Sequence, residues 1–281
     1  MASFGSTYKA QECAHKERVI SMNNEKLTTF EKGWLAIFTI AITLATLYFS
    51  IGSQQILLDW IISPISAITG IFCVVMAAKG KISTFYWGIV NTALFAYLSF
   101  VAGFLGDAVM FGFFLVPMQF IGIKTWRGRL QRDSTEDVRM KRLTTKHRIL
   151  IFGLILITSS IFAIFLNAAD GFLAYFQANS DVYANLYERF GIVLLGPFLD
   201  AFSVVAQITG QFLMLYALEE QWDIWIFINI KNLFLWLFAF ILVGELQAWM
   251  IVTLVMHVGY FGNSIYGKIN WHRGVKHAKI M

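Results

Sequence analysis

Two tryptophans and two asparagines in one hydrophobic segment could hold an aromatic solute. Trp222, Trp225, Asn229 and Asn232 follow one another at spacings of three, four and three residues. Because an α-helix turns about 100° per residue, this spacing places all four side chains on one helical face. Indole rings stack on flat or cationic rings, and amides both donate and accept hydrogen bonds. The stripe therefore indicates a site for a flat aromatic ring that carries hydroxyl and amide groups.

Part of this stripe is repeated in the first half of the chain. Trp87 and Asn91 have the same spacing as Trp225 and Asn229, and they also lie in a hydrophobic segment. An amide in the bilayer core costs several kcal/mol unless it is hydrogen-bonded, so we expect both asparagines to face the bundle interior or a wet cavity. For any single amide the alternative is helix-to-helix bonding, worth about 0.6 to 2 kcal/mol per bond.

Other polar side chains at membrane depth extend the candidate site. Gln119 follows Pro117, Asn263 follows His257 in the last hydrophobic segment, and Gln207 and Gln211 lie one turn apart. We expect a substrate-binding set of seven residues, which are Asn91, Gln119, Trp222, Trp225, Asn229, Asn232 and Asn263.

No arrangement in the sequence indicates catalysis or a metal site. The chain has no His-Glu-x-x-His pattern, and His257 stands alone at membrane depth. Lys231 and Asp200 are ionisable residues inside apolar segments, and Lys231 could snorkel or pair with Glu219 or Asp223. Because no paired carboxylates suggest a proton relay, the pattern favours downhill transport without a cofactor. An intramembrane enzyme and a non-transporting sensor are the competing classes.

The composition is that of a polytopic membrane protein. Of 281 residues, 58% are hydrophobic and only 14% are charged, and the mean hydropathy is +0.64. A soluble domain carries about 25% charged residues, and a spanning helix needs about 20 apolar ones. We expect an all-α membrane protein with about eight transmembrane helices, at 34–50, 57–78, 84–103, 107–125, 148–167, 194–217, 223–243 and 246–267.

The basic residues predict the orientation of these helices. Twenty of the 22 lie on one side of an eight-span arrangement: before residue 33, at 79–81, at 124–148 and beyond 267. Since positive loops stay in the cytoplasm, both termini are expected there. This bias also accounts for the net charge of +5, so no nucleic-acid partner is expected. The first 32 residues lack the pattern of a signal peptide.

A second doubled motif defines an internal repeat. Gly122 and Trp126 reappear as Gly267 and Trp271, and their composition is typical of close packing and helix ends. Two three-helix units separated by one helix run in the same direction, as in parallel-repeat transporters. The expected organisation is a tail and accessory helix (1–56), a first repeat (57–126), a basic linker with a linker helix and outer loop (127–193), a second repeat (194–271) and a tail (272–281).

These motifs resemble the PnuC-type nicotinamide riboside transporters over about residues 57–275. The resemblance rests on Trp87 with Asn91, the helix end from Pro117 to Trp126 and Arg127, the stripe from Trp222 to Asn232, and the closing Gly267 and Trp271.

The resemblance implies a 3+1+3 fold similar to SWEET sugar transporters. It also implies a homotrimer in the lipid bilayer of the bacterial inner membrane, and uptake of nicotinamide riboside by facilitated diffusion, followed by trapping through phosphorylation. The nicotinamide riboside itself is a pyridinium with a ribose and a carboxamide. The open alternatives are transport of thiamine, another vitamin or a nucleoside, and proton-coupled import. The first helix departs from the seven-span pattern of many relatives.

Overall fold

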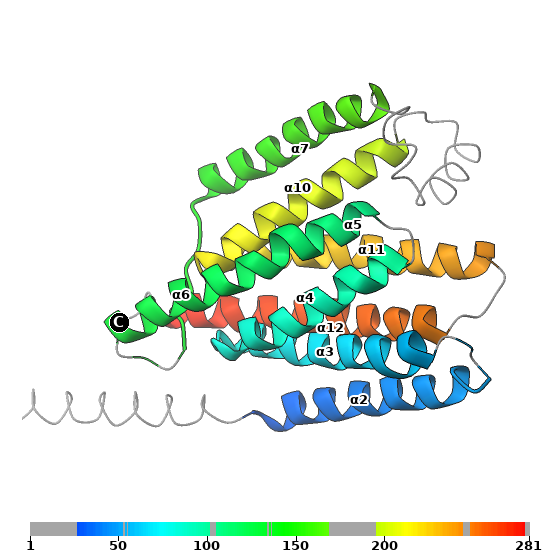
Figure 1. Ribbon diagram of the computed structural model, residues 1–281. Coiled ribbons are helices and arrows are strands. Elements are labelled where there is room, and N and C mark those ends of the chain that lie inside the picture. Colours follow the sequence, from blue (N-terminus) through cyan, green and yellow to red (C-terminus); the bar gives the residue numbers. More distant parts are fainter. Residues whose placement is uncertain are drawn as a thin grey trace, which may run out of the picture.

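The computed structural model of the chain describes residues 27–52, 54, 56–101, 105–133, 135, 137–168, 195–243 and 248–278 (Figure 1). Within these ranges the chain is helical, and the one extended pairing is a bridge between Lys141 and Leu218. The elements are α2 (Thr29–Phe49), η1 (Leu57–Ile62), α3 (Ser63–Lys79), α4 (Ser83–Val101), α5 (Leu105–Val109), η2 (Met110–Leu115), α6 (Val116–Asp133), α7 (Thr145–Ala168), α10 (Leu195–Leu215), α11 (Gln221–Val243) and α12 (Ala248–Ala278). The all-α class is confirmed.

Six of the described helices are long and apolar enough to cross a membrane. They are Thr29–Phe49, Leu57–Lys79, Ser83–Val101, Asp107–Asp133, Thr145–Phe165 and Ala248–Val275, and the apolar part described in α10 is shorter, at Ala201–Leu215. These helices have the length and composition expected of membrane spans. The expected outer loop and most of the expected N-terminal tail lie outside the described residues.

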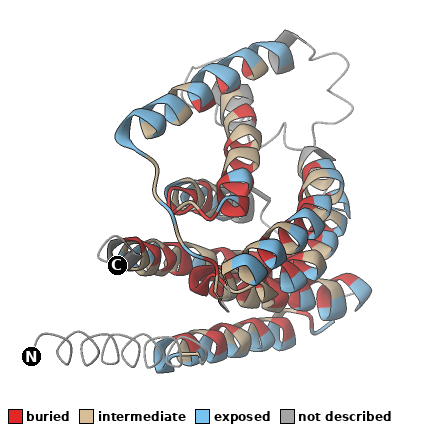
Figure 2. Cartoon of the chain, turned by 90° about the vertical axis from the view of Figure 1, so that its left-hand side faces the viewer, coloured by how far each residue is buried: buried red, intermediate tan, exposed pale blue. Residues whose placement is uncertain are grey.

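Six helices contact one another in a closed cycle. Along it α3 meets α4, α4 meets α6, α6 meets α10, α10 meets α11, α11 meets α12, and α12 returns to α3. The helix α2 packs outside this ring on α3 and α12, and α7 packs on α10 at the opposite side (Figure 1). Figure 2 shows the consequence, because exposed residues cover most of α2 and α7 while buried ones concentrate on the ring.

Two prolines account for the two π-helical segments. Pro64 and Pro117 each follow such a segment by two residues, at the start of α3 and of α6. A proline has no N–H to donate four residues back, so a continuous α-helical ladder cannot pass through it. The register shifts instead: Ser63 N donates to Leu58 O, and Val116 N donates to Phe111 O.

The repeated tryptophans join the two halves of the ring at one end of the bundle. Trp126, near the end of α6, donates its indole N–H to Met214 O of α10 over 3.2 Å. Trp271, near the end of α12, donates to Ala77 O and Ala78 O of α3 over 3.2 and 3.1 Å. The last carbonyls of a helix have no partner within it. Ala77 O and Met214 O also accept a bond from the turn after their own helix, so each half supplies an additional donor to a helix end of the other half. We call this the basic end, since the basic linker also lies here.

The repeated glycines leave space for the aromatic rings that pack on these indoles. Phe85 lies against Gly122 and meets Trp126 edge-on at 4.9 Å between ring centroids. Trp222 lies against Gly267 and meets Trp271 edge-on at 5.9 Å. A side chain on either glycine would occupy the space of the adjacent ring. The packing role expected for the glycines and indoles is what the structure shows.

A buried ion pair fixes the accessory helix to this end. Glu31 of α2 accepts a bond from Lys79 Nζ at 3.1 Å, with both side chains about 2% exposed or less. Tyr266 of α12 donates its hydroxyl to the same carboxylate at 2.7 Å. At the opposite end, Asp59 accepts the backbone N–H of Trp249 in the first turn of α12. Both contacts hold α2, α3 and α12 together as one wall.

The glycine packing predicts the effect of one added methyl group. A Cβ at Gly267 would lie 2.6 Å from the ring of Trp222, so Gly267→Ala should cost about 1 to 3 kcal/mol through overpacking. Gly128 has nothing within 4 Å of an added Cβ, so Gly128→Ala should be neutral or stabilising by up to about 1 kcal/mol. Unfolding of the purified variants in detergent measures both, and equal effects would contradict the packing described.

Candidate functional site

Two asparagines from opposite halves lie at matching depth in the ring. Asn91 lies eight residues after Ser83, the first residue of α4, and Asn229 lies eight residues after Gln221, the first residue of α11. At 1.5 Å per residue, both lie about 12 Å into the helices from the basic end. Both side chains are buried, at 7% and 5% exposure. We call Asn91, Asn229 and the polar residues that adjoin them the polar layer.

Asn91 joins three helices through both atoms of its amide. Its Nδ2 donates to Ser66 O of α3 at 2.8 Å, and its Oδ1 accepts the hydroxyl of Tyr260 of α12 at 3.2 Å. Gly70, one turn after Ser66, allows this approach because an added Cβ would meet both the Tyr260 hydroxyl and Asn91 Nδ2. Asn91 thus connects α4 with the wall formed by α3 and α12.

One face of α12 supplies the remaining partners. Asn229 Nδ2 donates to Ser264 Oγ at 2.8 Å, and Asn263 Nδ2 donates to Val74 O of α3 at 2.8 Å. Tyr260, Asn263 and Ser264 are three and four residues apart, so they share a face. The structure therefore brings Asn91, Asn229 and Asn263 together around α12.

The polar layer keeps hydrogen-bonding capacity that the protein itself does not use. Among the described residues, Asn229 and Asn263 bond through their amide nitrogens, and their amide oxygens receive no donor. Gln119 of α6 is buried beside Gly88 of α4, with its Oε1 2.5 Å from where a Cβ at Gly88 would lie. Spare acceptors at this depth suit a solute with hydroxyl or amide donors, because unpaired amides are costly in a membrane.

The aromatic residues of the stripe are placed unequally. Trp222 is 2% exposed, packs on Trp271 at the basic end, and has a buried indole nitrogen with no hydrogen-bond partner in the described part of the chain. Trp225 is half-buried against Gly210 of α10. Asn232, one turn beyond Asn229, is also half-buried. Trp222 therefore lies about two turns from Asn229, at the basic side of the layer.

The two carboxylates that the sequence offers to Lys231 pair with Lys268 instead. Lys268 occupies the carboxylates in question, because its Nζ lies 2.7 Å from Asp223 and 3.7 Å from Glu219. Lys231 interacts electrostatically with Asp107 of α5 and with His257 of α12. Asp107 lies at the opposite end of the bundle from Glu219. The charge of Lys231 therefore acts on groups away from the basic end.

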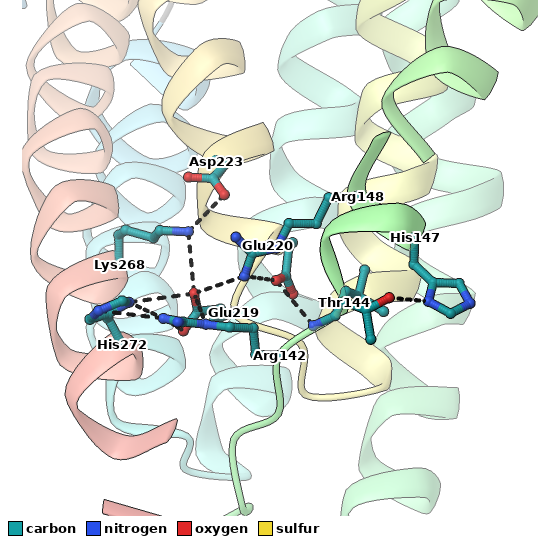
Figure 3. A network of polar contacts seen from close by, with 10 residues as sticks. Arg142, Thr144, His147, Arg148, Glu219, Glu220, Asp223, Lys268 and His272 are labelled. Carbon is teal, nitrogen blue, oxygen red and sulfur yellow. Dashed lines mark hydrogen bonds and ion pairs between the residues drawn. The ribbon is translucent and has the colours of Figure 1, made fainter. Parts of the chain in front are cut away.

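A separate ionic cluster lies at the basic end (Figure 3). Arg142 of the linker forms a paired contact with Glu219, in which Nε and Nη2 donate to the two carboxylate oxygens at 2.7 and 2.9 Å. Arg148 of α7 bridges to Glu220 at 2.7 Å, and His272 of α12 lies 3.6 Å from Glu219. We call this group the ion cluster. Glu219, at 1% exposure, is its centre.

The surrounding cations keep the Glu219 carboxyl ionised. Burial raises the pKa of this group because it penalises the charged form, but the hydrogen bonds from Arg142 and the positive charge of Lys268 outweigh burial and leave the pKa below its ordinary value. The hydrogen bonds to Glu219 likewise raise the pKa of Arg142. Across the described residues, no group of three or more His, Cys, Asp or Glu side chains could hold a metal ion.

Sequence reasoning missed Tyr260, Ser264 and Ser66 as partners in the polar layer. The signal for the first two was present, because Tyr260, Asn263, Ser264, Gly267 and Trp271 follow the spacing of one face of α12. Ser66 offered no such signal, since its backbone carbonyl is the main acceptor for Asn91. Partners of this kind are set by helix packing rather than by side-chain type.

Known proteins match this chain along most of its length. The family model described as the nicotinamide mononucleotide transporter matches residues 60–273. A relative in Neisseria mucosa, the nicotinamide riboside transporter PnuC, is 32% identical over 252 residues, which cover 89% of this chain and 83% of the relative. The PnuC of Haemophilus influenzae is 30% identical over 248 residues, covering 88% and 91%.

A solved structure agrees with these matches. The crystal structure of the vitamin B3 transporter PnuC is similar to this chain with a TM-score of 0.67 and 30% sequence identity. The similarity covers 92% of this chain and 98% of the other.

The contact between Tyr260 and Asn91 predicts measurable coupling. In a double-mutant cycle of Asn91→Ala and Tyr260→Phe, the interaction free energy should be about 0.6 kcal/mol and at most about 1.7 kcal/mol, as for other hydrogen bonds between membrane helices. The changes in unfolding free energy caused by Asn91→Ala and Asn270→Ala should be additive. Asn270 bonds to Ala78 O near the basic end. Unfolding free energies in detergent provide both values, and no coupling in the first cycle would contradict the geometry.

The ion cluster predicts a dependence of stability on acid. Because the folded-state pKa of Glu219 lies below the ordinary value of 4.5, its stabilisation is full above that pH and is lost as the pH falls through the folded-state value. Glu219→Gln should therefore cost about 1 to 2 kcal/mol at pH 7, since its partners are partly exposed, and the difference from the parent should shrink in acid.

Asp223→Asn is the matched control for this titration. Asp223 is 58% exposed and pairs with Lys268, so its replacement should change stability little at any pH. Unfolding of both variants between pH 7 and pH 3 measures the effect. A cost of Glu219→Gln that stays constant over this range would show that the carboxylate is not the stabilising species.

Proposed function

This chain belongs to the nicotinamide mononucleotide transporter family, and we propose that it carries nicotinamide riboside across a membrane by facilitated diffusion. The observation that carries the proposal is the family match over residues 60–273, which spans both asparagines of the polar layer. Two relatives at 32% and 30% identity are named nicotinamide riboside transporters. The chain covers more than four fifths of each, so the comparison concerns whole proteins.

The polar layer has the chemistry to receive such a solute. We propose that Asn91, Gln119, Trp222, Trp225, Asn229, Asn232 and Asn263 line the site. The unoccupied amide oxygens of Asn229 and Asn263 can accept hydrogen bonds from ribose hydroxyls or from the carboxamide. The half-buried Trp225 can stack on the pyridinium, which its indole also attracts through the ring's charge. Trp222 then closes the site on the basic side.

The contacts of the ring support an internal repeat. We propose two parallel three-helix units, at 57–126 and 194–271, joined through the linker at 127–193, with 1–56 as an accessory segment and 272–281 as a tail. The matched depth of Asn91 and Asn229 supports this division, as do the reciprocal bonds of Trp126 and Trp271. Two units in the same direction place the solute at their seam.

Topology and assembly follow from the same proposal. The basic residues favour a cytoplasmic basic end, which places both termini inside a bacterial inner membrane. The family resemblance favours a homotrimer, no cofactor, no catalytic activity of its own, and trapping of the imported riboside by phosphorylation in the cytoplasm.

Uptake into liposomes tests the function and one of its residues. Purified protein should give saturable uptake of labelled nicotinamide riboside that excess unlabelled riboside blocks and thiamine does not. Asn229→Ala should abolish binding and uptake because it removes an amide of the site. The variant should still fold, since Ser264 keeps its bond to Tyr260 O.

Asn270→Ala is the control, because it also removes an amide hydrogen bond, here to Ala78 O, but lies near the basic end. It should keep uptake near the parent level. Unchanged riboside affinity in folded Asn229→Ala would exclude Asn229 from the site. Thiamine uptake in place of riboside uptake would assign a different substrate.

A further inference from the structure

A short stretch of the basic linker touches both halves of the ring. Its residues Val138–Leu143, which we call the strap, make backbone bonds at two turns. Val138 N donates to Gly80 O at 3.1 Å, after α3. Lys141 N donates to Ala217 O at 2.8 Å, and Glu219 N donates to Lys141 O at 2.9 Å, after α10.

The two turns that receive the strap have the same unusual backbone. Gly80 and Ala217 have φ of 72° and 55°, in the left-handed region. Each follows the helix whose last carbonyls are bonded by an indole of the other half: Trp271 at α3 and Trp126 at α10. The strap therefore bridges two helix ends, each of which also accepts an indole N–H from the other half.

Side chains of the strap close the basic end of the ring. Val138 is 4% exposed and belongs to the same apolar cluster as Trp126, Trp222 and Trp271. Met140 packs against Gly274 of α12, where an added Cβ would lie 2.7 Å from its sulfur. Trp126 and Trp271 are fully buried. The buried indoles and the strap therefore lie between a solute in the polar layer and the basic end.

Among the described residues, the strap makes more polar contacts at α10 than at α3. At α10 it has two backbone bonds, together with the paired contact of Arg142 with Glu219 at 2.7 and 2.9 Å (Figure 3). At α3 it has one backbone bond and, just before it, the ion pair of Lys81 with Asp137 at 3.2 Å, whose side chains are 20% and 18% exposed. Partly exposed pairs of this kind contribute little.

We propose that the strap is the cytoplasmic latch of the transport cycle, released at Gly80 and retained at Glu219. This inference rests on the proposed function, because a carrier must open its site to each side in turn. Opening toward the basic end requires the ends of α3 and α10 to separate, and the strap spans that separation. The weaker attachment opens, and the ion cluster keeps the strap on the second half.

Two reversible tethers test which attachment must open. In a background of Cys13→Ala and Cys73→Ala, one variant carries Lys81→Cys with Asp137→Cys and another carries Lys141→Cys with Leu218→Cys. A short bifunctional methanethiosulfonate links either pair, and a reductant removes the link. Riboside uptake is measured in liposomes, and riboside binding is measured in detergent by thermal shift. Both are measured before linking, after linking and after reduction.

The tether between 81 and 137 should abolish uptake, with recovery on reduction and with binding retained. The tether between 141 and 218 should leave uptake at the level of the unlinked variant, because that attachment does not open. Full uptake with the 81–137 tether overturns the latch, and loss of uptake with the 141–218 tether overturns the assignment of the opening side. A parent protein that binds no riboside and takes up none contradicts the proposed function instead.

Amide hydrogen exchange in the unlinked parent protein gives a second, independent result. During transport the amide of Val138 should exchange faster than the amides of Lys141 and Glu219, because only its bond is broken in each cycle. Equal or slower exchange at Val138 overturns the latch even if a cysteine variant fails to fold.

Discussion

The architecture depends on satisfying the backbone carbonyls where α3 and α10 end. Such carbonyls have no partner within their own helix, and next to a bilayer an unpaired one is costly. Here the turn after each helix supplies one donor, Gly80 N or Ala217 N. An indole of the opposite half, Trp271 or Trp126, supplies another. Because each helix end also accepts a bond from the opposite half, folding joins the two halves at this end of the ring. Gly267 and Gly122 follow from this constraint, since the indoles and their aromatic neighbours need the space.

The polar layer depends on the same joining of halves. Once the ends are fixed, the equal distance along α4 and α11 brings Asn91 and Asn229 to one depth. The halves are nevertheless used differently. Both polar atoms of the Asn91 amide are hydrogen-bonded, to Ser66 and to Tyr260. The amide oxygen of Asn229 accepts no hydrogen bond from the described residues. The first half thus uses its asparagine to join helices, whereas the second half keeps an amide oxygen that can accept a bond from a solute.

Local sequence patterns predicted much of the fold and of the polar layer. The remainder depends on contacts between residues that are far apart in the sequence. Hydropathy located the helices because each spanning segment must be apolar along its own length. The spacing of Gly267 and Trp271 predicted a packed helix end, and the stripe predicted which face of α11 is polar. No local pattern distinguishes Trp222, which packs on Trp271, from Trp225 one turn later. The partners of Lys231 and the course of Val138–Leu143 also depend on residues far away in the sequence, so they required the structure.

A structure determined with nicotinamide riboside bound tests the central claim most directly. We expect the solute inside the ring at the depth of Asn91 and Asn229, with its ribose or carboxamide within hydrogen-bond distance of the amide oxygen of Asn229 and its pyridinium beside Trp225. A riboside bound outside the ring, or inside it without contact to either asparagine, would show that the polar layer is not the binding site.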